Sequence, residues 1–234
     1  MIQKMFTMCT LAACLMISHL QAIQVVRAPT TPDMLEGGNA KARYTFQVDA
    51  KHEGKQGVVI VSSHLEDVLP GWPKPVQVVN RTLCTTTDPV EAVTCEVNTR
   101  YEGERFACDV QFSDDEVERR SFCPFPIFKT DDKGHRIEIS VMHPEAEHYS
   151  VSLSGYKPDE ILELHSTSAE EYFSQSFSYY EQMAMTWSPA VMGQYRGLGT
   201  YEIRGKDSQL AVNVVWGDVV PMTKRAAQRY LDSL

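Results

Sequence analysis

The chain has 234 residues, 43% of them hydrophobic, and its 22 Lys+Arg against 31 Asp+Glu give a formal net charge of −9. This balance argues against nucleic-acid binding, which needs clusters of Lys and Arg to displace counterions, and against broad adhesion to anionic lipid. The length suits one large domain or two small ones.

The first 22 residues have the layout of a secretory signal peptide. Lys4 is the only charged residue before position 27, and an apolar run from Met5 to Leu20 follows it. That run is too short for a spanning helix, which needs about 20 apolar residues. A basic start, an apolar middle and the small residue Ala22 predict cleavage before Ile23. We therefore expect a secreted or periplasmic protein without a membrane span.

An alternative cleavage site lies inside the same run. Residues 11–14 (LAAC) resemble the lipobox of bacterial lipoproteins, in which the cysteine becomes lipidated and N-terminal. A lipid anchor at Cys14 would make the protein a membrane-tethered lipoprotein. Lipoproteins usually turn polar after the cysteine, whereas this chain stays apolar for several residues, so cleavage after Ala22 is favoured.

The next part of the chain predicts a flexible arm and then a β domain. Residues 23–41 contain prolines, a glycine pair and few large apolar side chains, which indicates a loose N-terminal arm. From 42 to 142, short alternating segments such as ARYTFQVDA and RFACDVQF are separated by turn residues. Alternation with a period of two is typical of strands with one buried face.

Four cysteines lie within this first domain. An even number behind a secretory signal predicts two disulfides, and their spacing lacks the paired knuckles of a zinc site. Cys95 and Cys108 are in step with apolar neighbours, so both sulfurs should point to the core. Three pairings remain open; 84–95 with 108–123 is favoured because each bond would link successive strands. The predicted disulfide residues are Cys84, Cys95, Cys108 and Cys123.

A second β domain is predicted from 143 to 218, with strands at 149–155, 161–166, 199–205 and 209–217. Short strands at this spacing are typical of a sandwich or barrel. Residues 168–187 are ambiguous: Ser168 and Glu171 could form the capping box of a helix. Aromatic residues alternating with serines favour a β-hairpin instead.

Residues 219–234 predict a short amphipathic helix. The apolar positions from Met222 to Leu234 share one helical face, and Lys224, Arg225 and Arg229 lie elsewhere. We expect this helix to pack on the second β domain; the alternative is docking onto a partner protein.

Residues 146–218 resemble bacterial immunoglobulin-like domains. GYKPDEILEL at 155–164 has their Gly-x-x-Pro-x-Glu turn, and GLGTYEIRG at 197–205 has their Gly-Thr-Tyr strand. The resemblance implies a β-sandwich and a binding, spacing or adhesion role, and it carries no catalytic residue. The fold class expected for the whole chain is mainly β, with two small antiparallel β-sandwich-like domains and a C-terminal helix.

Motifs for catalysis or metal binding are sparse. His143 and His148 are five positions apart with Pro144 between them, whereas zinc peptidases use histidines four apart on one helical face. We read this segment as a solvated joint between the domains. His165 is expected on a strand. We therefore assign no catalytic residue, metal ligand or cofactor.

The best candidate for a contact surface is the proline-rich segment at 70–75. Trp72 could present a large apolar face, and Pro73 and Pro75 would stiffen the loop and lower the entropy cost of binding. The alternative is that Trp72 closes one end of the β domain.

The sequence as a whole favours a secreted, non-catalytic binding or interaction protein of the bacterial envelope or extracellular space. Its partner would be another protein or an envelope polymer. A hydrolase acting on polysaccharide or peptidoglycan is the first alternative, because strands can bring distant carboxylates together. A structural subunit of an envelope assembly is the second.

Overall fold

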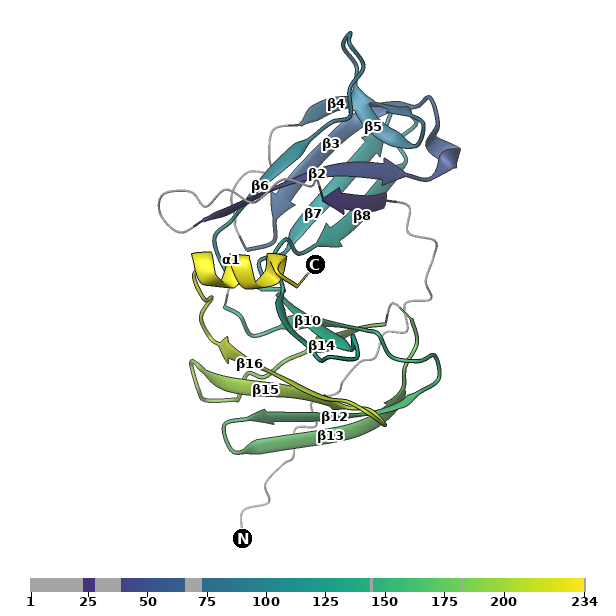
Figure 1. The fold of residues 1–234 in the computed structure, drawn as a ribbon. Helices are drawn as coiled ribbons and strands as arrows, with labels where there is room; N and C mark the ends of the chain where they lie inside the picture. Colours follow the sequence, from purple (N-terminus) through teal and green to yellow (C-terminus); the bar gives the residue numbers. More distant parts are fainter. Residues whose placement is uncertain (1–22, 28–38, 66–72, 144, 182, 234) are drawn as a thin grey trace.

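The computed structural model describes residues 23–27, 39–65, 73–143, 145–181 and 183–233. The predicted signal peptide at 1–22 lies outside the described residues. As expected, the protein is mainly β, with antiparallel sheets and one short C-terminal helix, α1 (Lys224–Leu231). The strands form two units, one above the other in Figure 1, with α1 between them.

The first unit is built on one eight-stranded sheet in the order β1-β2-β5-β4-β3-β7-β8, and β6 also pairs with β2. All of its pairings are antiparallel. The sheet curls, so that β1 comes close to β8. Its strands are β1 (Ile23–Arg27), β2 (Ala40–Val48), β3 (Gln56–Ser63), β4 (Lys74–Val79), β5 (Thr82–Thr85), β6 (Cys95–Thr99), β7 (Phe106–Phe112) and β8 (Val117–Phe122), and a 3-10 turn, η1 (Ala50–His52), precedes β3.

The core of this unit follows from the alternation in its strands. In β2 every second residue is buried, and Tyr44, Phe46 and Val48 pack against Val110 and Phe112 of β7 and against apolar residues of the other strands. Burial of such side chains contributes about 1.5–3 kcal/mol each.

The second unit contains two four-stranded antiparallel sheets, in the orders β14-β11-β10-β9 and β13-β12-β15-β16. Side chains from both sheets fill one core cluster, as in a β-sandwich. The strands are β9 (Ile127–Thr130), β10 (Arg136–Val141), β11 (Tyr149–Ser154), β12 (Ile161–Ser168), β13 (Glu171–Ser178), β14 (Ala184–Trp187), β15 (Gly197–Arg204) and β16 (Gln209–Trp216).

Two buried tryptophans in this core donate hydrogen bonds from their indole N–H groups to serines of β12. Trp187 Nε1 donates to Ser166 Oγ at 2.8 Å, and Trp216 Nε1 donates to Ser168 Oγ at 2.9 Å. Ser168 Oγ in turn donates to the carbonyl of Pro189. The alternating serines of β12 thus satisfy polar atoms that burial would otherwise leave without a partner.

The boundary between the units differs from the expected one at 142/143. Strands β9 and β10 pair with each other and with β11, so residues 127–141 belong to the second unit. The chain changes unit between β8 and β9, at residues 123–126. Strand alternation marks where a strand lies but does not state which sheet it joins.

Residues 171–178 and 184–187 are strands, as the alternation favoured, but they do not form a hairpin with each other. β13 pairs with β12 in one sheet, and β14 pairs with β11 in the facing sheet. The strand pattern was therefore correct and the predicted pairing was wrong.

The buried face of helix α1 packs on the core of the first unit, and its Tyr230 also contacts Phe128 of β9 in the second unit. Met222 and Ala227 are 3% and 2% exposed within the core cluster of the first unit, and Ala226 and Tyr230 pack against it. The expectation of packing on the second domain was wrong, and the buried face is not available to a partner.

The two units also meet at a turn of the first unit. Val141 N, in β10 of the second unit, donates to Gly103 O of this turn at 2.8 Å. Leu65, which follows β3, is buried in the core cluster of the second unit. Among the described residues, no helix combines the length and apolarity needed to cross a membrane.

Candidate functional site

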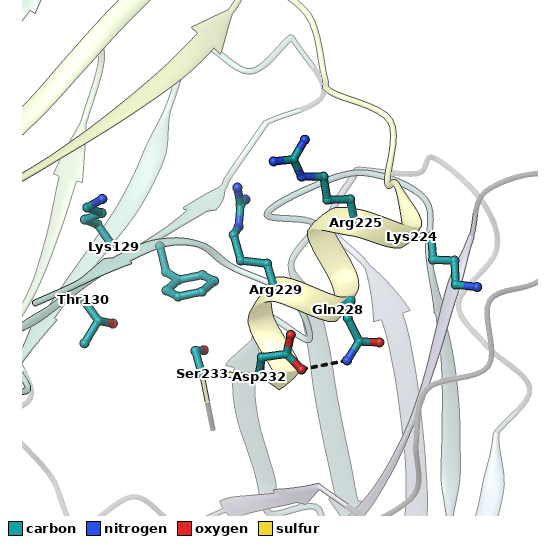
Figure 2. A pocket seen from close by; sticks show the side chains of 9 residues that line it. Lys129, Thr130, Lys224, Arg225, Gln228, Arg229, Asp232 and Ser233 are labelled. Carbon is teal, nitrogen blue, oxygen red and sulfur yellow. Dashed lines mark hydrogen bonds between the residues drawn. The ribbon is translucent and has the colours of Figure 1, made fainter. Parts of the chain in front are cut away.

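An open groove lies between strand β9 and helix α1. Its volume is about 930 Å³. The wall on the side of β9 is formed by Phe128, Lys129 and Thr130, and the other wall is one side of α1, with Lys224, Arg225, Gln228, Arg229, Asp232 and Ser233 (Figure 2). Because β9 belongs to the second unit and α1 packs on the first, the groove lies where the two units meet.

The helix is held in place by its cap and by its apolar face. Thr223 is the N-cap, and its Oγ1 accepts a hydrogen bond from Ala226 N at 3.1 Å. Tyr230 packs edge-on against Phe125 and Phe128, with ring centroids 5.9 and 5.7 Å away. With this face fixed against the protein, the cationic positions of α1 are left exposed.

The groove is strongly positive. Four of its lining side chains are cationic, and Asp232 is the only anionic one, so the lining carries a net charge of +3 in a chain whose net charge is −9. Asp232 accepts a hydrogen bond from Gln228 Nε2 at 2.8 Å. Figure 2 shows Arg225 and Arg229 extending from α1 on the side of Lys129.

These cations have few compensating contacts. Within the described residues, the side chains of Lys129, Lys224, Arg225 and Arg229 form no ion pair or hydrogen bond. The guanidinium of Arg229 lies 5.8 Å from the ring centroid of Phe128. Its charge also lowers the pKa of Glu102, against a larger effect of burial that raises it.

The positions of the cations are unfavourable for the helix itself. Lys224 and Arg225 occupy its first turn, which has no acidic residue, and cations there oppose the helix dipole by about 0.3–1 kcal/mol each. Arg225 and Arg229 are like charges four residues apart, which costs about 0.2–0.5 kcal/mol. A bound anion would offset both costs, and the arrangement therefore favours an anionic ligand.

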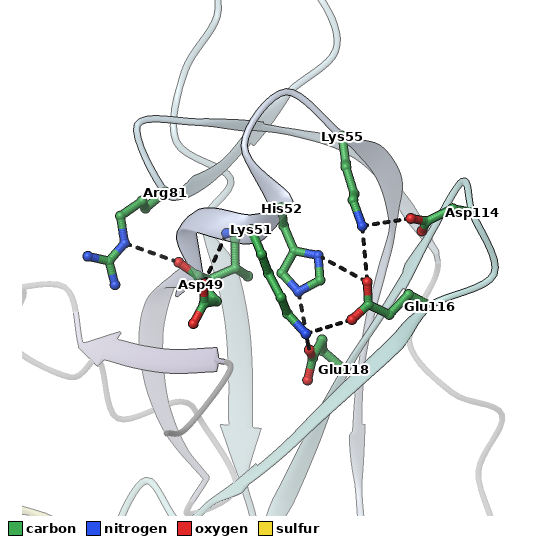
Figure 3. Close-up of polar contacts among 9 residues, drawn as sticks. Asp49, Lys51, His52, Lys55, Arg81, Asp114, Glu116 and Glu118 are labelled. Carbon is green, nitrogen blue, oxygen red and sulfur yellow. Dashed lines mark hydrogen bonds and ion pairs between the residues drawn. The ribbon is translucent and has the colours of Figure 1, made fainter. Parts of the chain in front are cut away.

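A second polar cluster connects η1 to the turn between β7 and β8 (Figure 3). Lys51 Nζ lies 2.6 Å from Glu116 Oε1 and 3.0 Å from Glu118 Oε1. Lys55 Nζ lies 2.6 Å from Asp114 Oδ2 and 3.0 Å from Glu116 Oε2. These hydrogen bonds hold the pKa of Glu116 and of Asp114 below their usual values and raise the pKa of both lysines.

His52 lies at the centre of this cluster and is fully buried. Its ring stacks on Phe112 with centroids 4.0 Å apart, and its Nε2 lies 3.1 Å from Glu118 Oε1. Its Nδ1 has no hydrogen-bond partner in the described structure and lies 3.6 Å from Glu116 Oε2.

His52, Glu116 and Glu118 are the one group of three potential metal ligands found in the described ranges, with ligand atoms within 4.8 Å of one another. The lysine ammonium groups already contact the carboxylate oxygens that a metal ion would use. The cluster therefore fits a structural role: it pins the β7–β8 turn to η1. No sequence motif indicated this cluster, because His52 and Glu118 are 66 positions apart.

The predicted contact surface is only partly within the described residues. Trp72 lies outside them. Pro73 and Pro75 are exposed, and Pro75 is in β4. They lie in the first unit and do not line the basic groove.

The predicted disulfide residues are all free thiols in the structure. Cys95 and Cys108 point into the core of the first unit, as their strand phase predicted, and are 6% and 0% exposed. Burial raises the pKa of the Cys84, Cys95, Cys108 and Cys123 thiols, and the neighbouring Cys95 raises that of Cys108 further. The formation and pairing of disulfides stay predictions.

The histidines singled out in the sequence do not converge on a site within the described residues. His143 and His148 are exposed, with ring centroids 6.4 Å apart, and His143 pairs with Glu145. They lie in the loop between β10 and β11, inside the second unit rather than at the joint. His165, on β12 as expected, contacts the hydroxyl of Tyr172 at 2.5 Å.

Sequence reasoning missed the basic groove. Lys224, Arg225 and Arg229 were recognised as lying off the apolar face of the helix, but Lys129 is 95 positions before Lys224 and joins them only through the packing of the two units.

No protein-family model matches the chain, and no curated protein matches it.

Proposed function

We propose that this is a non-catalytic binding protein of the bacterial envelope or extracellular space, and that its ligand is an anionic polymer bound in the groove between β9 and α1. The observation that carries the proposal is the set of four cations without ion-pair partners among the described residues, gathered in one groove of an acidic chain.

The residue types in the groove suit oxyanions. The planar guanidinium groups of Arg225 and Arg229 can each donate two parallel hydrogen bonds to a carboxylate or phosphate. Lys129, on the facing strand, supplies a compact charge that can adjust to the position of the anion. The shared chemistry is therefore a carboxylate or phosphate group.

The shape of the groove supports a chain-like ligand over a small molecule. It is open to solvent rather than enclosed, and sites for small molecules bury most of the surface of their ligand. A polymer with repeated charges can contact cations along the length of an open groove. Envelope polymers and acidic protein segments both have this character, and we favour the polymer because none of the groove-lining residues offers an exposed apolar anchor of the kind that protein partners use.

Charge reversal in the groove tests this proposal. Binding of polyglutamate and of polyphosphate of matched length would be measured by fluorescence anisotropy at several ionic strengths. We expect wild-type binding to weaken as salt rises, because the Debye length shortens from about 30 Å at 0.01 M to about 8 Å at 0.15 M. The double variant Arg225→Glu/Arg229→Glu should lose binding by at least roughly tenfold, because each lost charge-assisted hydrogen bond is worth about 1.5–3 kcal/mol.

A matched control separates the groove from net charge. The double variant Lys157→Glu/Lys206→Glu changes the charge of the chain by the same amount at two exposed positions of the second unit. It should bind as the wild type does. Equal losses in both double variants would show that only overall charge matters and would reject the groove as the site. The ratio of the wild-type affinities for polyglutamate and for polyphosphate shows whether the groove prefers carboxylate or phosphate groups.

A further inference from the structure

Among the residues that the structure describes, strand β13 is an edge strand with an open side. It hydrogen-bonds to β12 on one side and ends the sheet order on the other. Six of its eight residues are exposed and the other two are half-buried. Its free side therefore presents backbone N–H and C=O groups to solvent.

The usual devices that protect an edge strand are missing from β13. Proteins commonly place lysine, proline or a bulge on such strands to prevent pairing with another chain. The sequence of β13, EYFSQSFS, has neither lysine nor proline, and its one carboxylate residue, Glu171, is at its first position. Its pairing with β12 runs without a break from Ser168↔Glu171 to Ile161↔Ser178, so no bulge interrupts it.

The inner face of β13 extends past the core. Phe173 and Phe177 lie on the same face as Ser166 and Leu162 of β12, which point into the core of the second unit. Phe173 is nevertheless 38% exposed, and Phe177 is only half-buried. The apolar side chains of Phe173 and Phe177 are therefore partly exposed to solvent next to the unpaired backbone of β13.

We propose that a second copy of this chain pairs with β13 through its own β13, antiparallel, with the two-fold axis at Gln175. A two-fold axis perpendicular to a sheet pairs residues on the same face, because both strands keep their faces. With the axis at Gln175, Phe173 of each copy lies opposite Phe177 of the other, and this aromatic pair occurs twice. Cross-strand aromatic pairs contribute about 0.2–1 kcal/mol each.

The neighbouring registers are less favourable. An axis at Ser174 would place Phe177 opposite Glu171 and Phe173 opposite Gln175, so that a carboxylate would lie against a phenyl ring. An axis at Ser176 would place Phe177 opposite Gln175. Only the register centred on Gln175 pairs the two phenylalanines, Phe173 and Phe177, with each other.

The same register supports a second copy over an unrelated partner. On the outer face it pairs Ser174 with Ser176 and Tyr172 with Ser178, which leaves no steric conflict between large side chains. The two Glu171 carboxylates lie at opposite ends of the paired strands, roughly 27 Å apart at 3.4 Å per residue. The strand is therefore complementary to itself in shape and in charge.

The interface is small, and this sets the strength expected. Two paired strands of this length fall at the low end of specific protein interfaces, below about 1,200 Å² of buried surface. We expect a reversible dimer that forms with a dissociation constant of roughly 1–100 μM. The dimer is independent of the groove between β9 and α1.

A cysteine cross-link tests the register directly. In Gln175→Cys the two introduced thiols face each other across the axis, at the Cβ separation of about 4.5–5.5 Å of directly opposite residues. Mild oxidation of the purified full chain should give a covalent dimer that reduction dissolves. In Ser174→Cys, the matched control, the two thiols are diagonal neighbours about 7–8 Å apart and should link far more slowly, as should the wild type.

Sedimentation velocity tests the dimer without a cross-link. The average mass of the wild type should rise toward twice the monomer mass as concentration increases. Gln175→Lys places two ammonium groups against each other at the axis and should remain monomeric. Ala211→Lys changes an exposed residue of β16, the other edge strand of the same sheet, and should dimerise like the wild type.

Two results would overturn the proposal. One is a wild-type mass that stays monomeric at all concentrations, which would leave the edge to a strand of a different protein. The other is equal cross-linking of the Gln175→Cys and Ser174→Cys proteins, which would show contact without the proposed register.

Discussion

Replacing Ser168 with alanine removes the hydroxyl that joins Trp216 to Pro189 inside the second unit. Ser168 is 7% exposed and Trp216 is 1% exposed, so water cannot take the place of the hydroxyl without opening the core. The change leaves two buried groups without a partner: the indole N–H of Trp216, now bonded at 2.9 Å, and the carbonyl of Pro189.

The structure gives the magnitude of this effect. A buried polar group left without a hydrogen bond costs about 1–3 kcal/mol, so two such groups predict a loss of about 2–6 kcal/mol in the free energy of unfolding of the second unit. Unfolding would be measured in urea by tryptophan fluorescence, since Trp187 and Trp216 both report on this core. The midpoint should fall while the slope stays unchanged, because the surface exposed on unfolding is the same.

Two controls make the reasoning testable. Ser152→Ala removes an exposed serine hydroxyl of β11 and should change stability by no more than about 0.5 kcal/mol. In a Trp216→Phe background the indole donor is already absent, so Ser168→Ala should cost less there than in the wild type. A Ser168→Ala midpoint equal to that of Ser152→Ala would refute the assigned role of the hydroxyl.

Two further predictions concern the first unit. The pKa of Glu116 is held below its usual value of 4.5 by Lys51 and Lys55, so its stabilising effect is present above that pH and is lost as the pH falls through the lowered value. In urea titrations, Glu116→Gln should therefore reduce the difference in the free energy of unfolding between neutral and acidic pH. The same difference in the variant and in the wild type would contradict this. The predicted disulfides are tested by alkylating the cysteines in denaturant, because burial alone would slow the alkylation of free thiols. We expect Cys84, Cys95, Cys108 and Cys123 to be labelled only after reduction. Labelling of all four in the unreduced protein would reject the disulfides.

Most of the strands were predictable because they carry their own pattern, but β1 (Ile23–Arg27) lies in the stretch at 23–41 that was predicted to be a loose arm. In β2 and β16, buried residues alternate without interruption with exposed or half-buried ones, so the local sequence indicates both the strand and its inner face. The same holds for Cys95 and Cys108, whose burial followed from the phase of their strands. Information of this kind is local, and it does not depend on how distant segments meet.

Pairing between distant segments could not be obtained in this way. The pattern of β10 fits either unit equally well, and only its hydrogen bonds to β11 assign it to the second. The apolar face of α1 states that the helix packs on something, but not that Met222 and Ala227 enter the first core. The basic groove depends on both of these assignments, which is why no sequence motif revealed it.

Because α1 packs on the first unit, the core of that unit is built from segments far apart in the sequence. Its core is made from two stretches of chain, one before the second unit and one after it, and the second unit is in effect an insertion between them. A nascent chain that has emerged only as far as β16 has every strand of the first sheet but lacks Met222 and Ala227 in its core. The chain also crosses between the units twice, once before β9 and once after β16. Two chain segments therefore connect the units, and this restricts their relative motion more than a single flexible linker would.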